Sequence, residues 1–131
     1  MNAINNIKIL LKTSISVKEE ILQNEEIIKN LSTAIQSISL AIKTNNFIFF
    51  CGNGGSAADA QHIAAELTGR FKINRKSLKG VVLGSNLSSI TAIANDYGYD
   101  DVFSRELSAM GSNGDILIAY STSGNSESVV N

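Results

Sequence analysis

The feature that most constrains the fold is an apolar run followed at once by a glycine-rich turn. Residues 47–51 are three phenylalanines, an isoleucine and a cysteine, a composition typical of a buried, parallel strand. The turn after it reads Gly-Asn-Gly-Gly-Ser over residues 52–56. Small apolar residues then predict a helix to about Thr68, with Ser56 as its N-cap and Gly69 at its end. The pattern indicates a strand–turn–helix unit.

The rest of the chain repeats this alternation. We expect strands at 81–83 and 116–120, and helices at 88–95 and 102–110, with a further helix beginning after residue 126. Strands that alternate with helices predict an α/β domain built on a parallel sheet. Three strands are few for such a sheet, and the last unit stops in mid-helix at residue 131. We therefore expect the sequence to be a fragment of a longer protein.

The segment before the first strand is different. Residues 4–43 carry isoleucines and leucines at helical spacing, which predicts one long helix or two joined near residues 23–26. We divide the chain into a helical segment, 1–45, and an α/β domain, 46–131. The apolar stripe either caps the domain or forms an oligomer interface, and its length favours the interface.

Composition narrows the class of protein. Lys and Arg number 11 against 12 Asp and Glu, a net charge of −1, which argues against a nucleic-acid or membrane-surface partner. The single cysteine, Cys51, forms no internal disulfide and fits a cytoplasmic location. The N-terminus lacks the pattern of a secretory signal, and no apolar run is long enough to cross a membrane.

Two strand-to-helix turns are candidate phosphate sites, because ligands of open α/β sheets bind at the carboxyl ends of strands and helix N-termini attract anions. The turn at 52–56 matches neither the dinucleotide nor the P-loop pattern, and taken alone it indicates only a chain reversal. The second turn is more specific. Capping a helix needs one hydroxyl at most, whereas this turn carries four around Gly124: Ser121, Thr122, Ser123 and Ser126.

The helix after the first turn carries ionisable groups. His62 and Glu66 are four residues apart and share a helical face. Such a pair is often only an exposed hydrogen-bonded contact. Near a sugar-phosphate site, the carboxylate could instead take a proton from a carbon beside a carbonyl. The same spacing could supply two ligands to zinc, with the others coming from elsewhere.

Three blocks of the sequence resemble one family. They are similar, in order and spacing, to blocks of the bacterial phosphoheptose isomerases, which have the sugar-isomerase (SIS) fold. The blocks are residues Cys51 to His62 with Ala65 to Phe71, Asn95-Asp96-Tyr97-Gly98 with Phe103-Ser104-Arg105, and the turn 121–126. The resemblance covers the chain from the first strand onward. It implies a three-layer αβα sandwich with a parallel, flavodoxin-like sheet, preceded by N-terminal helices.

The resemblance also implies a reaction. The family interconverts sedoheptulose 7-phosphate and D-glycero-D-manno-heptose 7-phosphate through an enediol, the first step towards nucleotide-activated heptose for lipopolysaccharide or another surface glycan. By motif, Glu66 corresponds to its catalytic carboxylate. The substrate-binding positions it implies are Asn53, Gly54, Gly55, His62, Glu66, Asn95, Asp96, Ser121, Thr122, Ser123 and Ser126.

The resemblance further implies one zinc ion per subunit, with His62 and Glu66 as ligands and the rest beyond residue 131, and a homotetramer with sites at subunit interfaces. A catalytic histidine also lies beyond residue 131 in the family, so we expect residues 1–131 alone to be inactive. Two alternatives are a non-catalytic relative that binds the bacterial replication initiator and a sugar-phosphate-sensing SIS domain. The first typically lacks a glutamate at position 66, and the second usually accompanies a DNA-binding domain.

Overall fold

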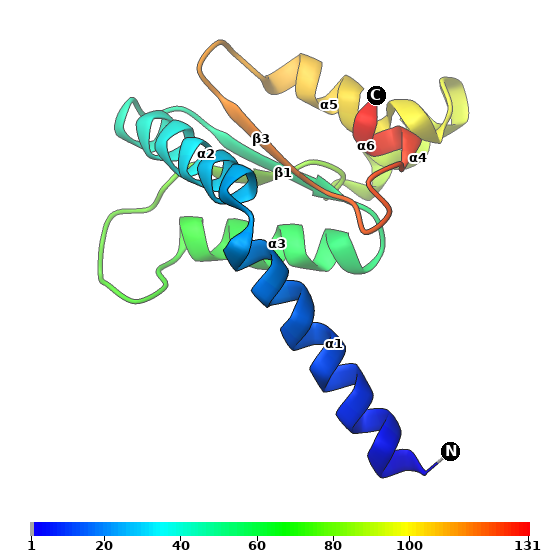
Figure 1. Cartoon of the computed structure of the whole chain (residues 1–131). Helices are drawn as coiled ribbons and strands as arrows, with labels where there is room; N and C mark the ends of the chain where they lie inside the picture. The colour runs from blue at the N-terminus through cyan, green and yellow to red at the C-terminus, as the bar shows by residue number, and fades with distance from the viewer. Residues whose placement is uncertain (1) are drawn as a thin grey trace. The chain divides into compact units, whose positions relative to one another are not determined.

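The computed structural model describes residues 2–131 (Figure 1). The helices and strands follow one another as α1 (Ala3–Gln23), α2 (Glu25–Lys43), β1 (Ile48–Gly52), α3 (Gly55–Thr68), β2 (Gly80–Val82), α4 (Leu87–Asp96), the short 3₁₀ helix η1 (Tyr99–Asp101), α5 (Val102–Met110), β3 (Ile116–Tyr120) and α6 (Glu127–Val130). The chain forms two compact units, which divide between Ser37 and Ile38. No helix within residues 2–131 is long and apolar enough to span a bilayer.

The first unit contains α1 and most of α2, as far as Ser37. Between the two helices, the side-chain oxygen of Asn24 accepts hydrogen bonds from the backbone N–H groups of Glu26 and Ile27, each at 3.1 Å. This is N-cap geometry, and it starts α2 where α1 ends. The prediction of a break near residues 23–26 is therefore confirmed.

The α1 helix has no buried residue. Its large apolar side chains are at least one-third exposed, and most are more than half exposed: Ile4, Ile7, Ile9, Leu10, Leu11, Ile15, Val17, Ile21 and Leu22. Apolar area on this scale is uncommon on the surface of a monomer.

The second unit is built on a sheet of strand order β2-β1-β3, in which β1 pairs in parallel with both neighbours. All five residues of β1 are buried. The predicted parallel α/β architecture is confirmed, and the observed strands agree with the predicted ones to within one residue. An apolar central strand needs cover on both faces, and helices cover β1 on both of them.

Successive β1 side chains point to opposite faces of the sheet. Ile48 and Phe50 pack with Ala60 and Ala64 of α3 and Ala41 of α2. On the other face, Phe49 and Cys51 pack with Val102 and Phe103 of α5 and with parts of α4 and α6. These two cores make three layers, as expected. Ile38, Ala41 and Ile42 belong to the first core, so the second unit begins inside α2, earlier than the boundary placed at residue 45.

The junction between β1 and α3 corrects one prediction. Helix α3 begins at Gly55, its N-cap is Gly54, and no side chain caps it; Ser56 is already inside the helix and is not the N-cap. Gly54 has φ +56° and ψ −119°, a conformation that favours glycine. At Gly52, a Cβ atom would lie 2.8 Å from that of Ser56. The first turn of α3 therefore lies directly against the end of β1.

Candidate functional site

The candidate site lies at the carboxyl edge of the sheet. Gly52 and Tyr120, the last residues of β1 and β3, are paired in register. The turns that follow, 53–54 and 121–126, therefore leave adjacent strands at the same edge, where ligands of open α/β sheets bind. The structure thus brings together two of the segments that the sequence singled out.

In the second turn, three of the four hydroxyls converge. The Ser121 hydroxyl lies 3.2 Å from that of Ser126 and 3.4 Å from that of Ser123. It also accepts a bond of 3.1 Å from the N–H of Gly124, and Ser123 accepts one from the N–H of Asn125. Ser126 stands at the N-cap of α6, but its side chain makes no capping bond. Thr122 is exposed, and no hydrogen bond joins it to this cluster within residues 2–131.

Asn53 links the first turn to two other segments. Its side-chain amide donates to the hydroxyl of Ser128 in α6 at 2.9 Å, and its carbonyl oxygen accepts from the hydroxyl of Tyr99 at 2.8 Å. Neither Tyr99 nor Ser128 was among the predicted site residues. The sequence offers no local signal for them, because they lie 46 and 75 positions from Asn53.

The predicted pair Asn95 and Asp96 ends α4. Both residues are exposed, and the amide of Asn95 donates to the Asp96 carboxylate at 2.8 Å. No hydrogen bond within residues 2–131 joins them to the two turns. The connection from this segment to the turns is made instead by Tyr99, three residues further on.

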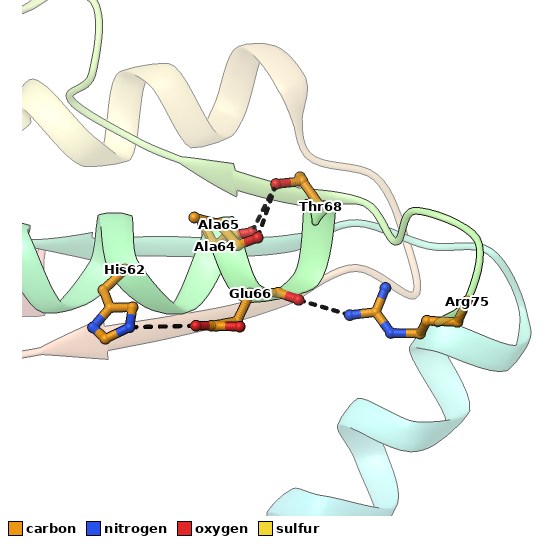
Figure 2. Close-up of polar contacts among 6 residues, drawn as sticks. All are labelled: His62, Ala64, Ala65, Glu66, Thr68 and Arg75. Carbon is orange, nitrogen blue, oxygen red and sulfur yellow. Dashed lines mark hydrogen bonds and ion pairs between the residues drawn. The ribbon is translucent and has the colours of Figure 1, made fainter. Parts of the chain in front are cut away.

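His62 and Glu66 lie together on α3, with His62 Nε2 3.4 Å from Glu66 Oε1 (Figure 2). Their side chains are 71% and 32% exposed. Ala60 and Ala64, on the same helix, face the sheet and are buried. The histidine–glutamate pair is therefore on the side of α3 that faces away from its own core.

Glu66 is distant from the turns at the sheet edge. It lies eleven residues after Gly55, the first residue of α3, which corresponds to about 16 Å along a helix axis. Figure 1 shows α3 running back along the sheet from the edge where β1 ends. Glu66 therefore lies near the opposite end of α3 from the turn that follows β1. A seven-carbon sugar phosphate is shorter than this separation.

The end of α3 that carries Glu66 is held by an arginine. The Arg75 guanidinium donates to the backbone carbonyl oxygen of Glu66 at 2.7 Å (Figure 2). It also donates to the backbone carbonyl oxygen of Leu67 at 2.9 Å. These carbonyls lie in the last turn of α3, where the helix itself supplies no N–H donors, and that of Leu67 also accepts from the N–H of Leu78 at 3.0 Å. A positive charge at a helix C-terminus is also electrostatically favourable. Arg75 was not predicted, because it lies in a polar stretch without periodicity.

Two ionisable side chains near the edge, the half-buried Tyr120 and the buried Cys51, have raised pKa values. Burial raises the pKa of the Tyr120 hydroxyl, and the charge of the Asp59 carboxylate raises it further. Tyr120 therefore remains a neutral phenol. Burial also raises the pKa of the Cys51 thiol, which favours the unreactive protonated form.

The chain thus combines an α/β domain, whose central parallel strand is covered on both faces, with a hydroxyl-rich turn at the carboxyl edge of the sheet. Residues 12–131 match the model of the SIS domain family, and the chain belongs to that family. It is 50% identical to the phosphoheptose isomerase of Aliarcobacter butzleri over 88% of this chain and 65% of that protein. It is 44% identical to the enzyme of that name from Clostridium acetobutylicum, over 95% of this chain and 64% of the relative.

Solved structures agree. The phosphoheptose isomerase of Neisseria gonorrhoeae superposes with a TM-score of 0.86 at 39% identity, over 98% of this chain and 66% of that one. A phosphoheptose isomerase from Francisella tularensis gives 0.89 at 28% identity, over 99% and 67%. The chain thus spans about two-thirds of the length of these relatives, and the predicted SIS fold is confirmed.

The contacts of Arg75 lead to a prediction about stability. Replacing Arg75 by Met should lower the free energy of unfolding by about 1–3 kcal/mol, because two charge-assisted hydrogen bonds to the end of α3 are lost. Urea unfolding measures the change. Lys76→Met removes the same charge from the neighbouring exposed residue and serves as the control. Equal stability of the two variants would show that Arg75 does not anchor the helix.

Proposed function

We propose that the protein is an aldose–ketose isomerase that interconverts sedoheptulose 7-phosphate and D-glycero-D-manno-heptose 7-phosphate. The observation that carries the proposal is the converging serine cluster at the edge where β1 and β3 end. Hydroxyls and the amides at a helix start donate to phosphate oxygens without a positive charge. The relatives named phosphoheptose isomerase support the choice of sugar. The product would enter nucleotide-activated heptose for lipopolysaccharide or another surface glycan.

The chemistry proposed for Glu66 is proton transfer between two carbons. Its carboxylate removes a proton from C1 of the ketose, the electron pair forms a C1=C2 double bond, and the C2 oxygen gains a proton. The enediol then takes a proton at C2 and loses one from the C1 hydroxyl, which leaves the aldose. A carboxylate that is one-third exposed and paired with a histidine side chain is suited to both proton transfers. The intact Glu66 also disfavours the non-catalytic alternative.

Replacing Glu66 by Gln should lower kcat roughly 10²–10⁴-fold, because the amide cannot carry the proton. The assay follows sedoheptulose 7-phosphate with the protein expressed from its complete coding sequence. Glu26→Gln makes the same change at an exposed position of α2 and should leave kcat unaltered. Normal turnover by Glu66→Gln would remove Glu66 from the mechanism.

The proposed site needs two copies of the chain. Glu66 lies about 16 Å along α3 from the start of that helix, and the pair His62–Glu66 faces outward. A homo-oligomer, expected to be a tetramer, would place Glu66 of one copy beside the serine-rich turn of another. The exposed apolar side chains of α1 supply the kind of surface that such an assembly buries.

Subunit mixing tests this arrangement. The variant Glu66→Gln keeps the turn, and the double variant Ser121→Ala with Ser123→Ala keeps Glu66. Oligomers that contain both should turn over substrate well above the sum of the two parents, because some sites then combine an intact carboxylate with an intact turn. The control mixes Glu66→Gln with the variant that carries all three substitutions. Without recovery in the first mixture, both groups act within one chain.

The zinc ion implied by the resemblance is a separate proposal. Imidazole nitrogen and carboxylate oxygen are suitable zinc ligands, and His62 and Glu66 place one of each 3.4 Å apart. Within residues 2–131 they do not belong to a group of three such residues, so they fit half of a tetrahedral site. Bound there, the ion would polarise substrate oxygens.

Metal content tests the zinc proposal without recourse to activity. After zinc loading and gel filtration, the intact protein should retain about one ion per chain. His62→Ala should retain much less, whereas Gln61→Ala, at the exposed neighbouring position, should behave like the parent. Equal zinc in both variants would exclude His62 as a ligand.

A further inference from the structure

The side chain of Asn53, a predicted sugar-binding residue, makes hydrogen bonds through both its carbonyl oxygen and its amide nitrogen. Its carbonyl oxygen accepts from the Tyr99 hydroxyl at 2.8 Å, and its amide donates to the Ser128 hydroxyl at 2.9 Å. These contacts join the β1–α3 turn, η1 and α6. Among residues 2–131, the hydrogen bonds that join two predicted site residues through their side chains each lie within a single segment.

The two contacts leave Asn53 able to bind a ligand. A primary amide has two N–H groups and two carbonyl lone pairs. One of each is used, so one N–H and one lone pair remain for sugar hydroxyls. The bonds to Tyr99 and Ser128 hold the plane of the amide and thereby direct the free groups. Without them, rotation about the side-chain bonds would have to be arrested on binding, at a cost in affinity.

The two partners differ in how they are placed. Ser128 is 5% exposed and is part of the packing of α6. Tyr99 is 50% exposed and follows Gly98, whose φ of +106° redirects the chain between α4 and η1. The hydroxyl of Tyr99 therefore contributes to the site while little of the core depends on its ring.

We propose that Tyr99 is a positioning residue for substrate: it holds the Asn53 amide in the orientation that binds the sugar hydroxyls. The inference rests on the proposed function, in which Asn53 contacts the sugar. It extends that function by adding a residue from η1 that no motif of the sequence indicated. The phosphate end of the substrate, bound by the serine-rich turn, does not depend on Tyr99.

Tyr99→Phe removes one hydroxyl and tests the proposal. With the protein expressed from its complete coding sequence, KM for sedoheptulose 7-phosphate should rise about tenfold with little change in kcat, as expected for a lost hydrogen bond that acts in ground and transition states alike. Inhibition by inorganic phosphate and the thermal midpoint should stay unchanged. Tyr97→Phe is the control, because its hydroxyl makes no hydrogen bond within residues 2–131 and its ring, stacked on Arg105, is retained.

Two results with Tyr99→Phe would overturn the proposal. One is a KM for Tyr99→Phe equal to that of Tyr97→Phe. The other is an equal loss of affinity for substrate and inorganic phosphate together with a lower thermal midpoint, since that pattern means general loosening of the site.

A spectroscopic readout separates this inference from the proposed function. The side-chain amide protons of Asn53, assigned by their absence in Asn53→Asp, should exchange with solvent several-fold faster in Tyr99→Phe than in the parent. If the parent protein shows no isomerase turnover, the proposed function fails. The exchange rates then decide separately whether Tyr99 holds the Asn53 amide. Faster exchange in Tyr99→Phe supports this role, and an unchanged rate overturns it.

Discussion

The candidate site depends on the parallel pairing of β1 with β3. This pairing sets Gly52 opposite Tyr120, so the glycine-rich turn and the serine-rich turn emerge side by side. It is maintained by the burial of all five β1 residues between two layers of helices. A slip of one residue would turn Phe49 and Phe50 towards the wrong faces. The apolar core therefore determines where the polar site forms.

Much of this arrangement follows from patterns that are local in sequence. Residues 47–51 are too apolar for any place other than a central strand, and alternating strands and helices leave a parallel sheet as the consistent architecture. The crowding of four hydroxyls around Gly124 likewise marks a turn with more donors than one helix start requires. The predictions of the central strand and of the parallel sheet are confirmed, because strand burial and helix periodicity depend on residues that are near one another in the chain.

What the sequence could not supply are contacts between distant residues and exact caps. Ser56 is a good capping residue by type, but it packs closely on Gly52 inside the first turn of α3, and Gly54 is the N-cap. Tyr99 and Ser128 reach Asn53 only because η1 and α6 both pack near the sheet edge. The distance between Glu66 and the turns also depends on the direction in which α3 runs. That distance makes a second copy of the chain part of the proposed site.

In the proposed site, the edge formed by β1 and β3 binds the phosphate of a sugar whose C1 and C2 lie at a glutamate of another copy. A crystal structure of the protein with sedoheptulose 7-phosphate is the sharpest test of this site. We expect the phosphate oxygens within hydrogen-bond distance of the hydroxyls of Ser121 and Ser123, and the carboxylate of Glu66 from a neighbouring chain beside C1 and C2. Phosphate bound away from the serine-rich turn would refute the proposed site.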